Sequence, residues 1–158
     1  LKNASKQLIA LLRSVDYVSL LVFAREASSS FLQQPGDQKA PMNEAIEALE
    51  AKGTTDGGAG LEEAYRTAKM QFIEGGNNQV ILATDGRFKV NERLRSFIQA
   101  QKNDGIVLTV IGFGTKDSQG IKTLKELAAL GGGGFLLFQP GKDNQFQLTE
   151  LIRLRSKR

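Results

Sequence analysis

Two loops of this 158-residue chain combine an aspartate with glycine and hydroxyl side chains. The apolar run 80–83 ends in Thr84, Asp85 and Gly86, and the motif 53–58 (Gly-Thr-Thr-Asp-Gly-Gly) precedes a helical pattern that starts at Leu61. A carboxylate beside a threonine hydroxyl suits a hard cation such as Mg²⁺, which takes about six oxygen ligands. The alternative is structural: Asp85-Gly86 forms a turn, and the aspartate of the second motif caps the following helix.

The chain contains no Cys and no His. This excludes disulfides, zinc sites with thiolate ligands and the Ser/His/Asp or Cys/His catalytic sets. No apolar run approaches the roughly 20 residues of a membrane span. Because the first residue is Leu1, we expect the chain to be a segment of a longer one, so that any targeting signal could have been lost with the missing start.

The net charge is localised at one end of the chain. There are 21 basic and 17 acidic residues, which gives +4, but residues 151–158 hold four basic residues and no acidic one. Residues 1–150 are therefore electrically balanced, and we expect the basic tail to be a solvated end or a linker. The charge gives no support for a nucleic-acid partner.

The hydrophobic pattern predicts an α/β fold with an open, mostly parallel, doubly wound sheet of Rossmann-like type, helices on both faces and one antiparallel edge strand. In such sheets ligands bind beyond the carboxyl ends of the strands. Tyr65 and Phe72 are expected to face the core, and Gly131–Gly134 to end a helix and lead into the last strand. The expected buried strands are 17–24, 79–85, 106–113 and 135–138, the edge strand is 25–32, and the helices are 1–14, 42–51, 61–74, 94–101 and 121–130.

Four segments in order resemble a von Willebrand factor A (VWA) domain of bacterial type. They are residues 16–24 (Asp-Tyr-Val-Ser-Leu-Leu-Val-Phe-Ala), 53–65, which holds Gly-Thr-Thr-Asp and Gly-Leu-Glu-Glu-Ala-Tyr, 80–86 (Val-Ile-Leu-Ala-Thr-Asp-Gly) and 105–114 (Gly-Ile-Val-Leu-Thr-Val-Ile-Gly-Phe-Gly). Each motif is weak alone, but the order and spacing are specific. The resemblance runs from Leu1 to about Phe138.

The resemblance implies a metal-ion-dependent adhesion site (MIDAS), in which Mg²⁺ or Mn²⁺ binds an Asp or Glu of a protein partner. The family's second loop gives a threonine ligand, which matches Thr55, and its third loop gives an aspartate, which matches Asp85. The neighbouring residues would form a rim that contacts the partner. These rim residues are Thr54, Asp56, Gly86, Arg87 and Phe88; solvated surface for Arg87 and a loop anchor for Phe88 are the alternatives.

The family's first strand and its Asp-x-Ser-x-Ser loop have no match in the chain. We therefore expect an N-terminally incomplete VWA-like domain over residues 1–145, a helix end and basic tail over 146–158, and weak or absent metal binding by this chain alone. In the family, the missing strand lies between the strands that match 17–24 and 79–85. We expect it to be supplied in trans, or the two strands to close on each other, or the chain to self-associate through them.

The resemblance favours a binding module over an enzyme: a protein-binding or adhesion domain that depends on a divalent cation in its full-length parent. One alternative is a metal-independent structural or interaction domain of a bacterial envelope protein. Another is phosphoryl transfer on Asp85, which the lack of an acidic pair near the first strand disfavours. The resemblance also favours a periplasmic, cell-envelope or extracellular location.

Overall fold

The computed structural model describes residues 2–23, 27–50, 57–84, 90–114, 117–138, 147–148 and 150. By contact density the chain divides into two compact units, residues 1–63 and 64–158. Both kinds of element alternate along it, which confirms the predicted α/β class. The elements are α1 (Lys2–Ala10), β1 (Tyr17–Phe23), β2 (Ala27–Pro35), α2 (Lys39–Glu47), α3 (Gly57–Met70), β3 (Asn78–Thr84), α4 (Glu92–Asn103), β4 (Ile106–Phe113), α5 (Ser118–Leu130) and β5 (Gly132–Phe138).

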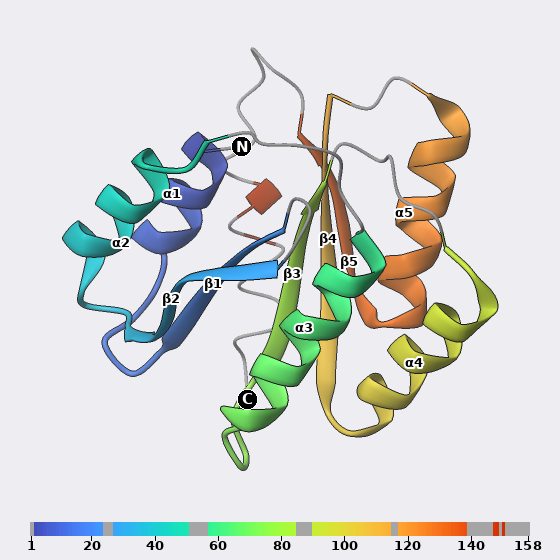
Figure 1. Ribbon diagram of the computed structural model, residues 1–158, viewed down its shortest axis with the longest axis horizontal. Helices are drawn as coiled ribbons and strands as arrows, with labels where there is room; N and C mark the ends of the chain where they lie inside the picture. The colour runs from blue at the N-terminus through green and yellow to red at the C-terminus, as the bar shows by residue number, and fades with distance from the viewer. Residues whose placement is uncertain are drawn as a thin grey trace. The chain divides into compact units, whose positions relative to one another are not determined.

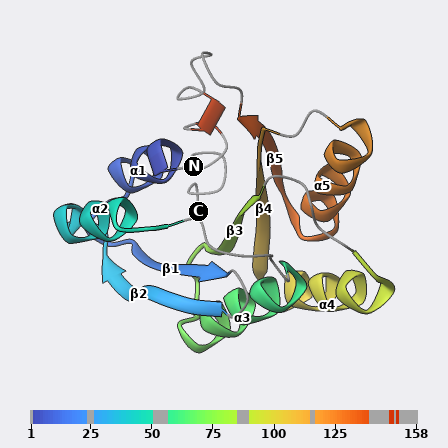
Figure 2. The ribbon, with the colours of Figure 1, turned by 45° about the horizontal axis from the view of Figure 1, so that its top comes forward.

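The first unit is built on an antiparallel hairpin. β1 pairs with β2 from Tyr17↔Pro35 to Phe23↔Ala27, so the antiparallel edge strand predicted from the Ser-rich segment is confirmed. The register shifts near Leu20, where the Ser19 hydroxyl accepts a hydrogen bond from the Gln33 amide at 2.9 Å. In Figures 1 and 2, α1 and α2 lie side by side next to this hairpin. The core of the unit combines Ile9, Met42 and Ile46, with Leu12, Val18, Leu20 and Phe31 packed against it.

Four helices begin earlier than their apolar patterns indicate: α2, α3, α4 at Glu92 instead of residue 94, and α5 at Ser118 instead of residue 121. The second helix starts at Lys39 rather than residue 42, because Pro41 lies in the first turn, where a missing N–H costs no hydrogen bond. It ends at Glu47, before the predicted end at residue 51. The third helix starts at Gly57, so its first turn is rich in glycine. A Cβ on Gly60 would lie 2.3 Å from the Phe23 ring, so the helix and this side chain pack closely at that residue.

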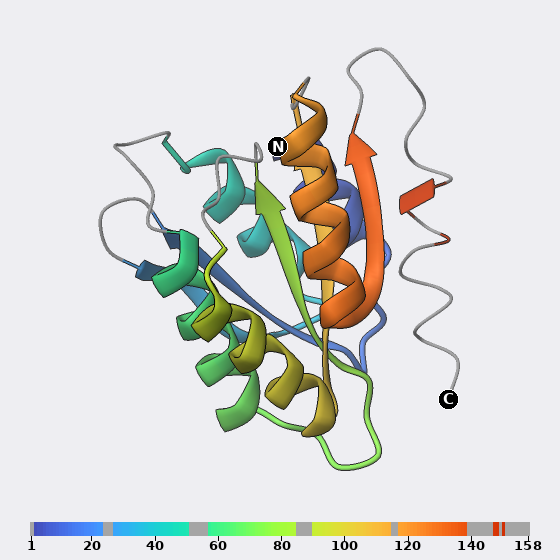
Figure 3. The same ribbon diagram turned by 90° about the vertical axis from the view of Figure 1, so that its right-hand side faces the viewer.

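The second unit is built on a parallel sheet in the order β3-β4-β5. Parallel strands are typically buried on both faces, and the central strand fits this: Ile106, Leu108 and Val110 are fully buried. The helices α4 and α5 both pack on β4 and on each other. Figure 3 shows β3 and β5 pointing the same way, with α5 alongside.

The glycine run forms the transition from α5 to β5. Gly131 is the C-cap of α5, and its carbonyl accepts a hydrogen bond from the Leu108 amide at 3.0 Å. The strand begins at Gly132, three residues earlier than predicted. Leu108 pairs with Gly132 and Val110 pairs with Phe135, so β5 has one more residue than β4 between these two pairs. The predicted role of the run, ending a helix and leading into the last strand, is confirmed.

The two aromatic residues predicted to face the core differ in outcome. Tyr65 is completely buried and its ring meets Phe97 edge-on, with centroids 5.6 Å apart. Phe72 is 40% exposed, so its prediction is wrong. The physical reason is that α3 ends at Met70, which places Phe72 in the following loop, where the helical period no longer sets its direction.

Candidate functional site

The carboxyl ends of β3 and β4 lie at the same edge of the sheet. The two strands are parallel and pair from Asn78↔Ile106 to Thr84↔Gly112 without a break in register. Val80 and Leu82 hold β3 in the core at 7% and 2% exposure. The loops that follow these strands therefore start next to each other, which is the arrangement the sequence predicted for a ligand site.

After each of the two strands the chain continues into a capped helix. Asn91 caps α4, its side-chain oxygen accepting from the Leu94 amide at 2.8 Å. Asp117 caps α5 by accepting from the amides of Gln119 and Gly120, at 3.3 and 2.8 Å. The N-termini of α4 and α5 carry a partial positive charge, which favours a carboxylate near them. The sequence contains both signals, an Asn and an Asp before apolar periodic runs.

Side chains of α5 and β5 pack closely on Gly112 at the end of β4. A Cβ on Gly112 would meet the Cδ1 atoms of Leu124 and Leu137 at 3.1 and 3.3 Å, so α5 and β5 approach the strand there. Two residues later Gly114 turns the chain with φ of +63°. The Gly-Phe-Gly motif is thus a packing and turning device at the predicted edge.

The predicted metal ligands and rim residues all lie outside the described residues. This holds for Thr55 and Asp85 and for Thr54, Asp56, Gly86, Arg87 and Phe88. What the structure gives is their flanks: Asp85 follows the last residue of β3, and Thr55 precedes the start of α3 by two positions. Across the described ranges no group of three or more acidic residues could hold a metal ion. The ligand assignment remains a prediction.

The sequence profile of the von Willebrand factor type A domain matches residues 1–151. This chain belongs to the VWA family. Its segment is 33% identical, over 157 residues, to the Escherichia coli (strain K12) protein described as "Uncharacterized protein YfbK". The alignment covers 97% of this chain but 27% of that protein, so the chain spans about a quarter of the relative's length.

Solved structures confirm the VWA-like fold. The BatB protein of Bacteroides thetaiotaomicron superposes with a TM-score of 0.80 at 20% identity, over 99% of this chain and 87% of that one. The proximal thread matrix protein 1 of the mussel byssus, in a form with a zinc-occupied MIDAS motif, gives a TM-score of 0.67 at 19% identity, over 97% of this chain and 40% of that one.

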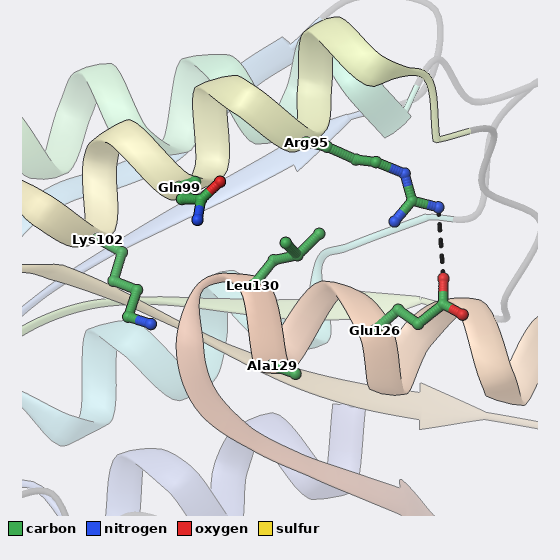
Figure 4. Close-up of a pocket in the computed structure, with 6 residues that line it drawn as sticks. All are labelled: Arg95, Gln99, Lys102, Glu126, Ala129 and Leu130. Carbon is green, nitrogen blue, oxygen red and sulfur yellow. Dashed lines mark hydrogen bonds and ion pairs between the residues drawn. The ribbon is translucent and has the colours of Figure 1, made fainter.

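Outside the predicted loops, the second unit of the VWA chain has an open groove of about 370 Å³ between α4 and α5. It is lined by three residues from each helix, drawn in Figure 4: Arg95, Gln99, Lys102, Glu126, Ala129 and Leu130. Nothing in the sequence pattern alone pointed to it, because its members are ordinary helix-surface residues. Their spacing on α4, at i, i+4 and i+7, is the only available signal.

Two buried hydroxyls of the second unit, those of Tyr65 and Thr109, lack a hydrogen bond. The burial of Tyr65 raises the pKa of its phenol well above the usual range. A desolvated hydroxyl without a partner costs stability. These groups add nothing to the predicted site and mark local imperfections of the core.

Proposed function

We propose that this VWA chain is a protein-binding module, and that its full-length parent recognises an exposed Asp or Glu of a protein partner through Mg²⁺ or Mn²⁺. The observation that carries the proposal is the unbroken parallel register of β3 and β4. That register supports a loop edge at which Asp85 directly follows the strand. Family membership adds that such an edge is where VWA domains place a MIDAS.

The cation would supply a positive centre with an open coordination position for a partner carboxylate. In this chain Thr55 would give a hydroxyl oxygen, and Asp85 a carboxylate that acts directly or through water. The rim residues Thr54, Asp56, Gly86, Arg87 and Phe88 would contact the partner around the ion. We propose that this set is incomplete in residues 1–158 and that Mg²⁺ binds it weakly without the family's Asp-x-Ser-x-Ser loop.

The test is calorimetry with Mg²⁺ and Mn²⁺ on the full-length parent and on its Thr55→Ala and Asp85→Ala variants. We expect a measurable heat of metal binding for the parent and the loss of most of that heat in each variant. Lys122→Ala, at an exposed position on α5, serves as the matched control and should bind like the parent. Unchanged heats in both site variants would overturn the proposed ligands, and the absence of heat for the parent itself would leave a metal-independent interaction domain.

The domain boundaries are part of the same proposal. We propose a VWA domain over 1–145, incomplete at its N-terminus, followed by a helix end and basic tail over 146–158. Among the described residues, β1 has β2 as its only strand neighbour, and β3 has β4 as its only one. This supports the view that a further strand, or a second copy of the chain, pairs with these strands.

Measuring the molecular mass of residues 1–158 in solution separates these cases. Self-association predicts a concentration-dependent mass above 17.2 kDa. A synthetic peptide that supplies the preceding segment of the parent should then restore the monomer mass and raise the unfolding temperature. A stable monomer whose unfolding the peptide does not change would contradict the proposal.

We further propose a periplasmic, cell-envelope or extracellular location for the parent, on the strength of family membership. No helix among the described residues is long and apolar enough to cross a bilayer. Fractionation of cells that produce the parent would test the location. Recovery with the cytoplasmic fraction alone would contradict it.

A further inference from the structure

We propose that the groove between α4 and α5 is a second binding surface, which takes a short, extended, acidic and apolar segment of a protein partner. The groove lies within one compact unit and draws no residue from the predicted metal loops. It therefore stands apart from the proposed metal-dependent function. Its chemistry is set by one stripe of side chains from each helix.

The two ends of the groove differ in charge. At one end Arg95 is neutralised: its Nη2 lies 3.3 Å from Glu126 Oε2, and its Nε lies 3.4 Å from Glu92 Oε1. Figure 4 shows this Arg95–Glu126 pair crossing from α4 to α5. At the other end Lys102 has no ion-pair partner among the described residues. The groove thus has one cation that forms no ion pair with the described residues.

The stem of Lys102 also lies close to the start of β5. A Cβ on Gly132 would lie 2.9 Å from Lys102 Cε and 3.2 Å from its Cδ, so the side-chain stem lies over the backbone at the start of β5. Packing of the stem lowers the rotamer entropy that an ion pair with this ammonium would otherwise cost. Lys102 is therefore a better anchor for a carboxylate than a free surface lysine.

Between these ends the groove offers an apolar floor and one amide. Ala129 is exposed and Leu130 half-buried on α5, and the exposed Gln99 amide lies between the two cationic residues of α4. The seven-residue offset from Arg95 to Lys102 spans about 10 Å along a helix, which is the length of about three extended residues. A partner segment with a carboxylate at Lys102 and apolar side chains over Leu130 would match both the cation and the apolar surface of the groove.

Other ligand classes match the groove less well. A nucleic acid needs several cations along its backbone, and here only Lys102 is unneutralised. No aromatic side chain lines the groove for stacking on a base. Charge complementarity therefore favours a protein segment with a single acidic residue.

The test uses ¹⁵N-labelled residues 1–158 and the peptide acetyl-Leu-Ala-Leu-Glu-amide, with its Gln counterpart as the uncharged probe. We expect amide shifts grouped on α4 and α5, and weaker binding of the Gln peptide by about fivefold, the upper range for one exposed ion pair. Affinity should fall as salt rises. Mg²⁺ or EDTA should leave it unchanged, which separates this surface from the metal site.

Two variants and one control decide the assignment. Lys102→Glu should weaken the Glu peptide by about tenfold, since attraction becomes repulsion. Ala129→Phe places a larger side chain at an exposed position of α5, which the fold tolerates, and should weaken binding of the Glu peptide by filling the groove. Lys122→Glu has the same charge change on α5 outside the groove and should bind normally. Equal effects of Lys102→Glu and Lys122→Glu, or no grouped shifts at millimolar peptide, would overturn the proposal.

Discussion

Gly133→Ala tests the close approach of β4 and β5. A Cβ at this position would lie 1.8 Å from the carbonyl oxygen of Leu108 and 2.9 Å from the amide nitrogen of Thr109. Real Cβ contacts essentially never fall below 3.0 Å, so the two strands must separate locally by about 1.2 Å, the difference between 3.0 and 1.8 Å. Both clashing atoms belong to the backbone, and no side-chain rotation can relieve them.

The cost follows from the contacts that this separation breaks. The Leu108 amide donates to Gly131 at 3.0 Å, and a shift of more than 1 Å takes such a bond beyond hydrogen-bond range. Losing about two ladder bonds at roughly 1 kcal/mol each, and loosening the packing of Leu108, outweighs the gain of up to about 1 kcal/mol from a stiffer unfolded chain. We expect a net loss of about 3 kcal/mol, or about 6–12 °C in Tm for a chain of this size.

Gly112→Ala is the matched control, in the neighbouring strand of the same sheet. Its Cβ would meet only the ends of flexible side chains, the nearest being Leu124 Cδ1 at 3.1 Å. We expect a change within about 1 kcal/mol. The assay is urea unfolding followed by circular dichroism at matched protein concentration. Equal stability of the two variants would show that the strands tolerate separation and would refute the argument from backbone contact.

Three further changes probe the ordered parts of the chain. Tyr65→Phe removes a buried hydroxyl without a partner and should raise the unfolding free energy by about 1 kcal/mol in the same assay. Asp16→Asn tests the ion pair with Arg13, whose side-chain hydrogen bond lowers the pKa of the Asp16 carboxyl. This ion pair stabilises the fold above the unfolded pKa of about 4, and its contribution is lost as the pH falls through the lower folded pKa. The free energy of unfolding of the variant should therefore decline less steeply below about pH 4 than that of the parent chain. An identical decline for both proteins would contradict this. Asn78→Ala removes a side-chain amide that accepts a hydrogen bond from the Ile73 N–H and donates one to the Ile73 carbonyl, both at 2.9 Å. Hydrogen exchange of the Ile73 amide should accelerate by about tenfold. An unchanged exchange rate would show that the turn forms without these two hydrogen bonds.

The sequence allowed the order and type of the elements to be predicted because each long element has a clear period. The buried run 106–113 was predicted with the limits that β4 has, since its β-branched residues are apolar on both faces. Errors arose where local chemistry overrides the period. Pro41 and the glycines from Gly57 lie in first turns and extend helices that the apolar pattern starts later. Phe72 fits the helical spacing of α3, but nothing in that spacing shows that the helix stops at Met70.

The candidate site likewise has a part that follows from hydrophobic patterning and a part that does not. The parallel sheet that would hold it follows from hydrophobic patterning and is confirmed by the structure, which adds the β3–β4 register. Its ligands Thr55 and Asp85 come from loop motifs and from family resemblance, and they remain predictions. The groove between α4 and α5 is the reverse case: its residues carry no motif, and only the folded helices bring Lys102 and Leu130 to one surface. A surface of this kind, made by two elements through tertiary packing, shows in a single sequence only as helical spacing within each element. The two proposals therefore rest on different kinds of evidence, and removal of metal should affect one of them and not the other.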